Sequence, residues 1–187
     1  SGNPVKVFTR TDRSPLANRS EALPAPDFTG SWSTTVLDTR SPLGRVEPPP
    51  LGKLGSGWGD EITIVQTPNQ LQVERAFFVA REMQPLIRYT YALDGSPTKH
   101  VIYMGRSGND PTSTAAWEGN RLVITSSYPF KDPKSSRTLT GKVTQTMWLQ
   151  ANTNTPFEPT LVVETTREGV LGGVSTTNRT VYTRGYR

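Results

Sequence analysis

The stretch LIRYTYALDG, residues 86–95, shows most clearly which class of fold this chain adopts. Its apolar and aromatic side chains fall on every second position, at Ile87, Tyr89, Tyr91 and Leu93. Strict alternation of this kind is typical of a β-strand with one buried face. The Asp94-Gly95 pair that follows favours a tight hairpin turn. The stretch therefore predicts a strand that turns back into an antiparallel neighbour.

Similar strand signals recur on both sides of this stretch, and Gly, Pro, Asn and Asp break them at regular intervals. The other predicted strands cover residues 32–36, 62–64, 71–79, 101–104, 112–118, 121–128, 139–150, 160–166 and 174–184. No segment between Phe28 and Arg184 shows helical periodicity. We therefore predict an all-β fold, a single antiparallel barrel of about ten strands.

The composition argues against several kinds of site. The 187 residues include no cysteine, which excludes disulfides, thiolate metal sites and thiol catalysis. His100 is the only histidine, so a zinc site or a Ser-His-Asp triad would depend on it alone. The chain has no Gly-x-Ser-x-Gly or phosphate-loop motif and no run of 18 apolar residues. We predict a protein that is not an enzyme, has no cofactor or metal, and does not itself span a membrane.

The net charge of +5 comes from scattered Arg and Lys residues. The densest basic cluster consists of Lys131, Lys134, Arg137 and Lys142. Because stacking aromatics are not interleaved with these cations, we expect no nucleic-acid site. Solvated loop charge is the first interpretation of the cluster. The alternative is attraction to an acidic partner or to an anionic lipid surface.

Residues 1–27 lack periodicity and contain four prolines, which favour extended backbone. We interpret this segment as an extended Pro-rich N-terminal arm and residues 28–187 as the barrel domain. A pre-extended segment loses less entropy when it docks on another surface. The arm's apolar residues Phe8, Leu16 and Leu23 are therefore candidate contacts with a partner protein.

Three aromatic residues of the barrel domain are further candidates for partner binding. Trp58 lies in a Gly-rich loop, and Phe78 and Trp148 alternate with the core-facing positions of their strands. Exposed aromatic side chains are enriched in interfaces. The alternative is that the arm or the Gly-rich loop covers them.

Arg75, Tyr89 and Tyr91 are candidate ligand-binding residues, because their alternation places them on inward faces. A buried guanidinium needs a carboxylate, carbonyl groups or an anionic ligand. Alternatively, Arg75 lies near a strand end and extends to water, while side chains fill a narrow barrel.

The two ends of the β-rich region carry a recognisable pair of motifs. Gly30-Ser31-Trp32 opens the first strand, and Val181-Tyr182-Thr183-Arg184 closes the last. With these motifs the chain resembles lipocalin-like (calycin) barrels. The resemblance implies that Arg184, with Arg179 as second choice, packs on Trp32 and closes one barrel end, as suits a guanidinium over an indole.

The chain is also similar to uncharacterised exported bacterial proteins of this class. The shared features are Leu37-Asp38, Leu93-Asp94-Gly95, the Trp117-Glu118-Gly119-Asn120 hairpin with Leu122-Val123-Ile124, and the Val-Tyr-x-Arg end. This similarity spans residues 28–184 and implies a fold, but no common activity.

Together these observations predict a non-catalytic binding or scaffold protein in the periplasm or another extracytoplasmic compartment. The start at Ser1 without an apolar leader fits a mature exported chain. We expect an accessory subunit that docks through its arm on a larger assembly, and a photosynthetic or respiratory membrane complex is one setting. The alternatives are a lipocalin-like carrier of a small apolar or anionic ligand and, third, an enzyme on a calycin-like barrel.

Overall fold

The computed structural model describes residues 25–34, 55–75, 78–79, 82–83, 86–100, 110–152 and 158–185. Ten strands form one antiparallel sheet in the order β6-β3-β2-β1-β12-β11-β10-β9-β8-β7. Their bounds are β1 Gly30–Thr34, β2 Glu61–Gln66, β3 Gln70–Arg75, β6 Ile87–Ala92, β7 Thr98–Lys99, β8 Thr112–Glu118, β9 Arg121–Lys131, β10 Thr138–Gln150, β11 Thr160–Arg167 and β12 Thr176–Arg184.

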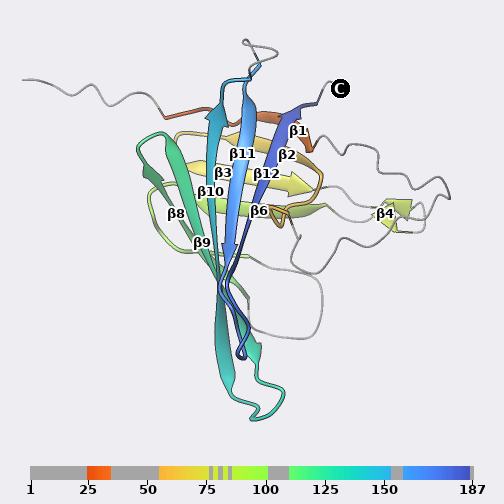
Figure 1. Cartoon of the computed structure of the whole chain (residues 1–187). Helices are drawn as coiled ribbons and strands as arrows, with labels where there is room; N and C mark the ends of the chain where they lie inside the picture. Colours follow the sequence, from red (N-terminus) through yellow and green to blue (C-terminus); the bar gives the residue numbers. More distant parts are fainter. Residues whose placement is uncertain are drawn as a thin grey trace, which may run out of the picture.

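The sheet curls into a nearly closed barrel. In Figure 1 strands β9 to β12 run up and down, and β2, β3 and β6 cross behind them. The two edges of the sheet approach each other where the Gly95 N–H donates to the Ala115 carbonyl oxygen at 3.0 Å. Strand β1 pairs with both β2 and β12, so it joins the two ends of the chain's β-rich region. The predicted all-β antiparallel barrel is confirmed for the described residues.

The alternation seen in the sequence sets which side chains form the core. In β2, β3 and β9 the buried positions are every second residue, as a sheet with one wet face requires. The largest fully buried side chains are Trp32, Trp58, Tyr182, Phe28, Ile64, Leu71, Leu122, Ile124, Met147, Leu161, Val73 and Val162. All of these except Val162 belong to one contiguous cluster inside the barrel.

Three strand predictions need correction or fall outside the description. The predicted strand 71–79 ends at Arg75, and β4 (Phe78–Val79) instead pairs with β5 (Glu82–Met83) in a separate sheet. The last strand starts at Thr176, because a tight turn occupies the preceding residues. The predicted strand 101–104 and the arm residues 1–24 lie outside the described residues.

Strands β9 and β10 are the longest, with 11 and 13 residues. Their hairpin extends beyond the rest of the barrel at the bottom of Figure 1, and the β11–β12 turn lies at the same end. Within the described part of the chain, no helix is long and apolar enough to cross a membrane.

Candidate functional site: the barrel interior and its outer face

The top end of the barrel is closed by aromatic side chains around Trp32. Trp32 is 1% exposed, and its Nε1–H donates to the Phe28 carbonyl oxygen at 2.8 Å. The Arg184 guanidinium carbon lies 4.9 Å from the centre of the Trp32 ring. Phe28 in turn stacks on Trp117 with ring centres 5.6 Å apart. The two residues that the sequence assigned to barrel closure, Trp32 and Arg184, are therefore in contact.

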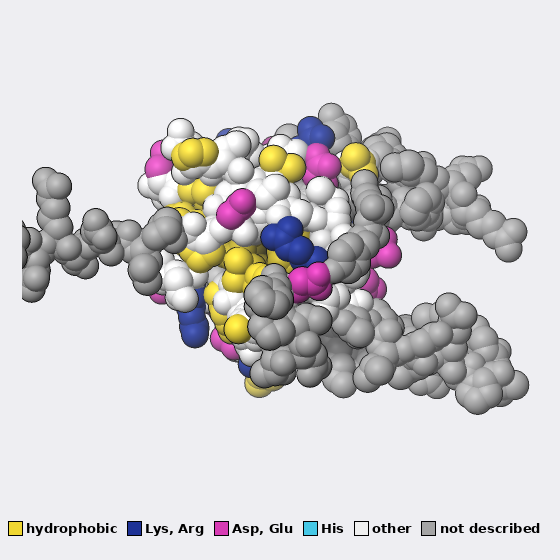
Figure 2. Space-filling view, turned by 90° about the horizontal axis from the view of Figure 1, so that it is seen from above, with side chains coloured by type: hydrophobic (Ala, Val, Ile, Leu, Met, Phe, Trp, Pro, Cys, Tyr) yellow, Lys and Arg dark blue, Asp and Glu magenta, His cyan; other side chains and the backbone are white. Residues whose placement is uncertain are grey.

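A pocket of about 270 Å³ lies beside this closed end, lined by Ala25, Asp27, Gln66, Thr67, Pro68, Leu93 and Trp117. Figure 2 shows this end of the molecule, with hydrophobic side chains near the middle of the face and scattered charged ones around them. Gln66 accepts from the Phe28 N–H and donates to the Pro26 carbonyl. Hydrogen bonds from Thr29 lower the pKa of Asp27 below its usual range. The polar groups of the pocket thus hold the chain's own residues 26–29.

A loop of the chain itself inserts the side chains of Ser56 and Trp58 into the barrel, whereas Gly57 between them is exposed. Residues 55–59, Gly-Ser-Gly-Trp-Gly, form what we call the inner loop. All three of its glycines have positive φ, between 56° and 97°. This left-handed backbone is open to glycine at little cost and lets the loop fold inward. Within it, Trp58 is only 2% exposed and belongs to the core cluster.

Inward-facing side chains from four strands hold the inner loop. Gln145 Nε2 donates to the Ser56 carbonyl at 2.6 Å, and Thr165 Oγ1 donates to the same oxygen at 3.4 Å. Trp58 Nε1 donates to the Tyr91 hydroxyl at 3.2 Å. Tyr182 donates to the Gly59 carbonyl at 2.7 Å and also bonds the Ser56 hydroxyl. The loop is therefore bound as a ligand would be, by a ring of polar side chains.

The three predicted ligand-binding residues contact this loop or lie next to it. A Cβ at Gly59 would be 2.7 Å from Arg75 Nε, so the Arg75 side chain packs directly on the loop backbone. Tyr91 is 3% exposed, and burial raises the pKa of its hydroxyl. Burial also raises the pKa of Tyr89, an effect that the nearby charge of Arg75 opposes. Arg75, Tyr89 and Tyr91 thus lie close together, and Arg75 and Tyr91 contact a segment of the same chain.

A chain of hydroxyl groups connects His100 to strands β8 and β9. His100 Nε2 lies 2.8 Å from Ser113 Oγ, which lies 2.6 Å from Ser126 Oγ. Burial lowers the pKa of His100, which favours the neutral imidazole. Ser113 is 1% exposed, and its oxygen is shared between two partners. The His100–Ser113 pair has the contact of a serine–histidine dyad. Separately, no group of three or more His, Asp or Glu among the described residues could hold a metal ion.

Arg167 places an unmatched donor inside the barrel. Its Nη2 donates to the Gly55 carbonyl at 2.9 Å. Its Nη1 is buried and has no hydrogen-bond partner, and the same holds for Asn178 Nδ2 on the neighbouring strand. Burial lowers the pKa of Arg167, and the nearby Tyr128 hydroxyl opposes this effect. These two nitrogens are the buried side-chain donors left without a hydrogen bond in the described part of the chain.

The outer face of β9 to β12 carries an aromatic–cationic cluster. The Arg121 guanidinium lies 4.5 Å from the centre of the Trp148 ring, and that of Arg179 lies 5.7 Å away. Val162 and Val181 continue the row across β11 and β12, paired in register with Trp148 and with each other. Val162 is fully buried, whereas Val181 is 43% exposed. We call Arg121, Trp148, Arg179 and Val181 the outer patch, and Val162 lies buried beneath it.

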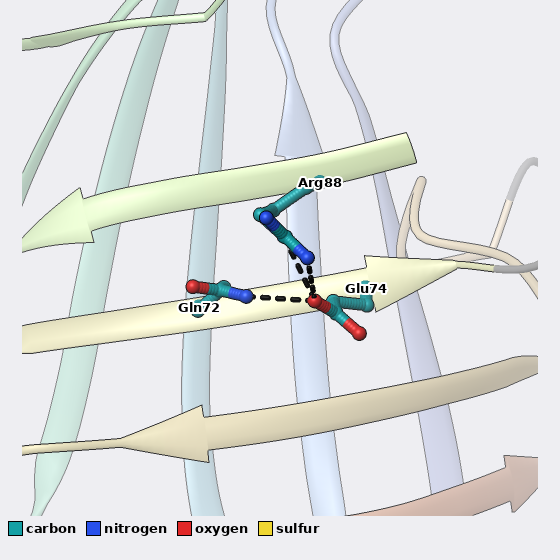
Figure 3. Close-up of polar contacts among 3 residues, drawn as sticks. All are labelled: Gln72, Glu74 and Arg88. Carbon is teal, nitrogen blue, oxygen red and sulfur yellow. Dashed lines mark hydrogen bonds and ion pairs between the residues drawn. The ribbon is translucent and has the colours of Figure 1, made fainter. Parts of the chain in front are cut away.

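The outer face of β3 and β6 is built differently. There Arg88 bonds Glu74 Oε1 through Nε at 2.8 Å and through Nη2 at 2.6 Å, and Gln72 donates to the same oxygen (Figure 3). On this side, therefore, the guanidinium of Arg88 is paired with the carboxylate of Glu74. On the outer patch, by contrast, the two guanidinium groups lie against an indole ring.

The remaining predicted site residues differ in where they lie. Trp58 corrects our expectation of a surface aromatic: its side chain lies in the core, where it is not available to a partner. Trp148 does point outward, opposite Met147, and is half-buried between two arginines. The side chain of Phe78 lies outside the described part of the chain, as do Phe8, Leu16 and Leu23.

Comparisons with known proteins leave the function to be argued from this geometry. No family model matches the chain. A search of curated proteins and a search of solved structures also found no match. The class that the structure defines is an all-β antiparallel barrel whose interior holds a loop of its own chain.

Proposed function

We propose that this protein is a non-enzymatic binding protein that acts through its outer surface, as an accessory subunit on a larger extracytoplasmic assembly. The observation that carries this proposal is the inner loop. An enzyme or a carrier needs an accessible concave site lined by free polar groups. Here Gln145, Tyr91 and Tyr182 are engaged with residues 55–59 instead.

The outer patch is the surface that we propose for partner contact. Tryptophan and arginine are the residues most enriched among those that dominate binding energy at protein interfaces. The two arginines hold the Trp148 ring in place, so the ring loses little conformational freedom when a partner binds. The predicted N-terminal arm is a second proposed contact, and a photosynthetic or respiratory membrane complex remains one setting.

We also propose that the barrel is lipocalin-like. The Gly30-Ser31-Trp32 motif and the Arg184 guanidinium over the Trp32 ring support this assignment. A Cβ at Gly30 would be 2.9 Å from Arg184 Nη1, so a larger residue at this position of the motif would collide with the Arg184 side chain. The ten-stranded sheet and the inner loop are the features in which this barrel departs from a simple ligand carrier.

Site-specific photo-crosslinking tests the proposed contact surface. A photoreactive amino acid at position 148 should crosslink one partner in native membranes or extracts, whereas the same group at position 88, on the opposite outer face, should not. Deletion of residues 1–27 should weaken the crosslink if the arm also binds. Equal crosslinking from both positions, or none from position 148, would contradict the proposal.

A second candidate function rests on the unmatched donors at Arg167 Nη1 and Asn178 Nδ2. Buried donors of this kind suit a small anion, which would make the barrel a carrier. A carboxylate or phosphate ligand should then raise the melting temperature of the wild type but not of Arg167→Gln. No shift with either anion would leave the outer surface as the binding site.

A further inference from the structure

The β11–β12 turn, residues 168–175, presents apolar side chains to solvent. Val170, Leu171 and Val174 are 42%, 60% and 83% exposed. Few large hydrophobic side chains on the described surface are this exposed, and here three lie within five residues. The turn forms the end of the β11–β12 hairpin (Figure 1), and Trp148 of β10 pairs with Val162, well before β11 ends at Arg167. Clustered exposed apolar side chains mark a contact site more often than an accident of sequence.

The backbone of this turn makes the leucine more unusual. The Gly173 N–H donates to the Val170 carbonyl at 2.9 Å, and the two central residues, Leu171 and Gly172, have φ of 53° and 86°. This is the geometry of a type I′ turn, whose first central position is normally Asn, Asp or Gly. A leucine in left-handed backbone is strained. Folding alone would therefore favour a small polar residue here, and strain kept at an exposed position points to a function.

Basic side chains lie beside the apolar turn, on the β9–β10 hairpin. Val170 Cγ1 would lie 3.4 Å from a Cβ at Gly141, so the turn packs beside the β9–β10 hairpin. Residues 131–142 of that hairpin and residues 168–175 together carry four cations and two carboxylates, a net charge of +2. The cations are Lys131, Lys134, Arg137 and Lys142.

Both carboxylates near the apolar turn are already engaged. Asp132 accepts from the Lys134 N–H and the Ser135 hydroxyl within its own turn. Glu168 lies 3.7 Å from Lys142 Nζ and neutralises that lysine. The other three cations, Lys131, Lys134 and Arg137, are exposed at the hairpin end and have no carboxylate partner among the ion pairs of the described residues.

We propose that this end of the barrel docks on an anionic lipid bilayer, with the 170–174 turn inserted at the interface and the β9–β10 cations on the headgroups. An exposed apolar turn beside a basic hairpin end matches such a surface in both polarity and charge. A protein partner would have to supply a groove and acidic groups in matching places. An anionic bilayer offers both an apolar interior for the turn and negative headgroups for the cations, without a specifically shaped site.

Each cation close to an anionic membrane strengthens binding about fivefold at low ionic strength. Lys134→Gln with Arg137→Gln should therefore weaken binding about twenty-five-fold, and high salt should remove the difference. Leu171→Asn with Val174→Ser should weaken binding on the order of thirtyfold, because two apolar side chains no longer leave water. Asn suits the left-handed position, so this variant keeps the turn.

Vesicle co-sedimentation tests the proposal with the full chain. Wild type should bind phosphatidylcholine vesicles that contain phosphatidylglycerol more strongly than pure phosphatidylcholine vesicles. The matched control is Leu86→Asn with Val65→Ser, which makes the same changes at residues 46% and 45% exposed elsewhere. The control should bind like wild type. A wild type that fails to bind the anionic vesicles, or an L171N/V174S variant that binds equally well, would overturn the proposal.

A site-specific fluorophore gives an independent readout, because the chain contains no cysteine. An environment-sensitive dye on Leu171→Cys should shift to the blue with anionic vesicles, and the same dye on Val65→Cys should not. Equal responses at both positions would contradict insertion of the turn. Trp148→Ala should leave this signal unchanged, so failure of the proposed partner contact and failure of membrane docking can be told apart.

Discussion

At the scale of single residues, Gly59 shows how closely the inner loop is fitted to the barrel. Its φ is 97°, and a Cβ there would be 2.7 Å from Arg75 Nε. Gly95 has a similar φ of 83°, but nothing lies within 4 Å of its Cβ position. The two positions therefore separate the cost of the backbone conformation from the cost of crowding.

We expect Gly95→Ala to lower the free energy of unfolding by about 1 kcal/mol, the cost of the left-handed conformation alone. Gly59→Ala should lower it by about 2–3 kcal/mol, because the methyl group also displaces Arg75. Urea denaturation of both variants measures the difference. Equal losses would show that Arg75 does not pack on the loop.

His100 should make stability depend on pH in the acidic range. Burial lowers the pKa of His100 in the folded state below its ordinary value of 6.5, so the unfolded chain binds a proton more readily. The resulting stabilisation is complete above about pH 6.5 and decreases as the pH falls toward the folded pKa. Denaturation curves should show this loss for wild type and a smaller one for His100→Gln. Identical pH profiles for the two proteins would contradict a buried neutral imidazole.

At the scale of secondary-structure elements, the strands could be predicted because burial repeats every two residues. In β3 and β9 the alternation fixed both the strand and its inward face. The break after Arg75 could not be predicted, since Phe78 and Val79 continue the β-forming composition while pairing with another strand. The burial of Val162 could not be predicted either. Its side chain points outward, and it is buried by neighbours on adjacent strands such as Trp148.

The inner loop could not be predicted from periodicity, because a Gly-rich loop has none. The glycines at 55, 57 and 59 around Trp58 indicate a long loop, and from this pattern we expect the tryptophan on the surface, which is wrong. The partners of the loop, Gln145, Tyr91 and Tyr182, lie 33 to 126 residues away in sequence from the groups they bond. The only local signal was glycine on alternate positions, which permits positive φ at each of them.

The hydroxyl of Tyr182 joins β12 to the inner loop, and a Tyr-to-Phe change removes it while keeping the ring. It bonds the Gly59 carbonyl and the Ser56 hydroxyl, and burial raises its pKa to about 12. Tyr182→Phe leaves both loop groups buried without this partner, so it should cost about 1–3 kcal/mol of stability. Tyr128→Phe, at a tyrosine that is 38% exposed, should cost less. A Tyr182→Phe variant as stable as wild type would show that the loop does not depend on this contact.

At the scale of the whole molecule, one end and the interior of the barrel are closed by the chain itself, and the outer surfaces remain for binding. The top end is closed by Trp32 and Arg184, and the inner loop inserts Ser56 and Trp58 into the interior. The outer patch around Trp148 and the apolar turn around Leu171 face solvent. We therefore attribute binding to the outside of the barrel, and this attribution depends on the inner loop staying in place.

The most direct test of that claim is hydrogen exchange at the tryptophan indole groups, followed by NMR. The Trp58 Nε1–H donates to Tyr91 inside the barrel, as the Trp32 Nε1–H donates to Phe28, whereas Trp148 lies on the outer face. We predict slow exchange for Trp58, close to that of Trp32 and well below that of Trp148. Exchange of Trp58 as fast as that of Trp148 would show that the inner loop leaves the barrel readily. The interior would then be open to a ligand, and binding could no longer be attributed to the outside of the barrel.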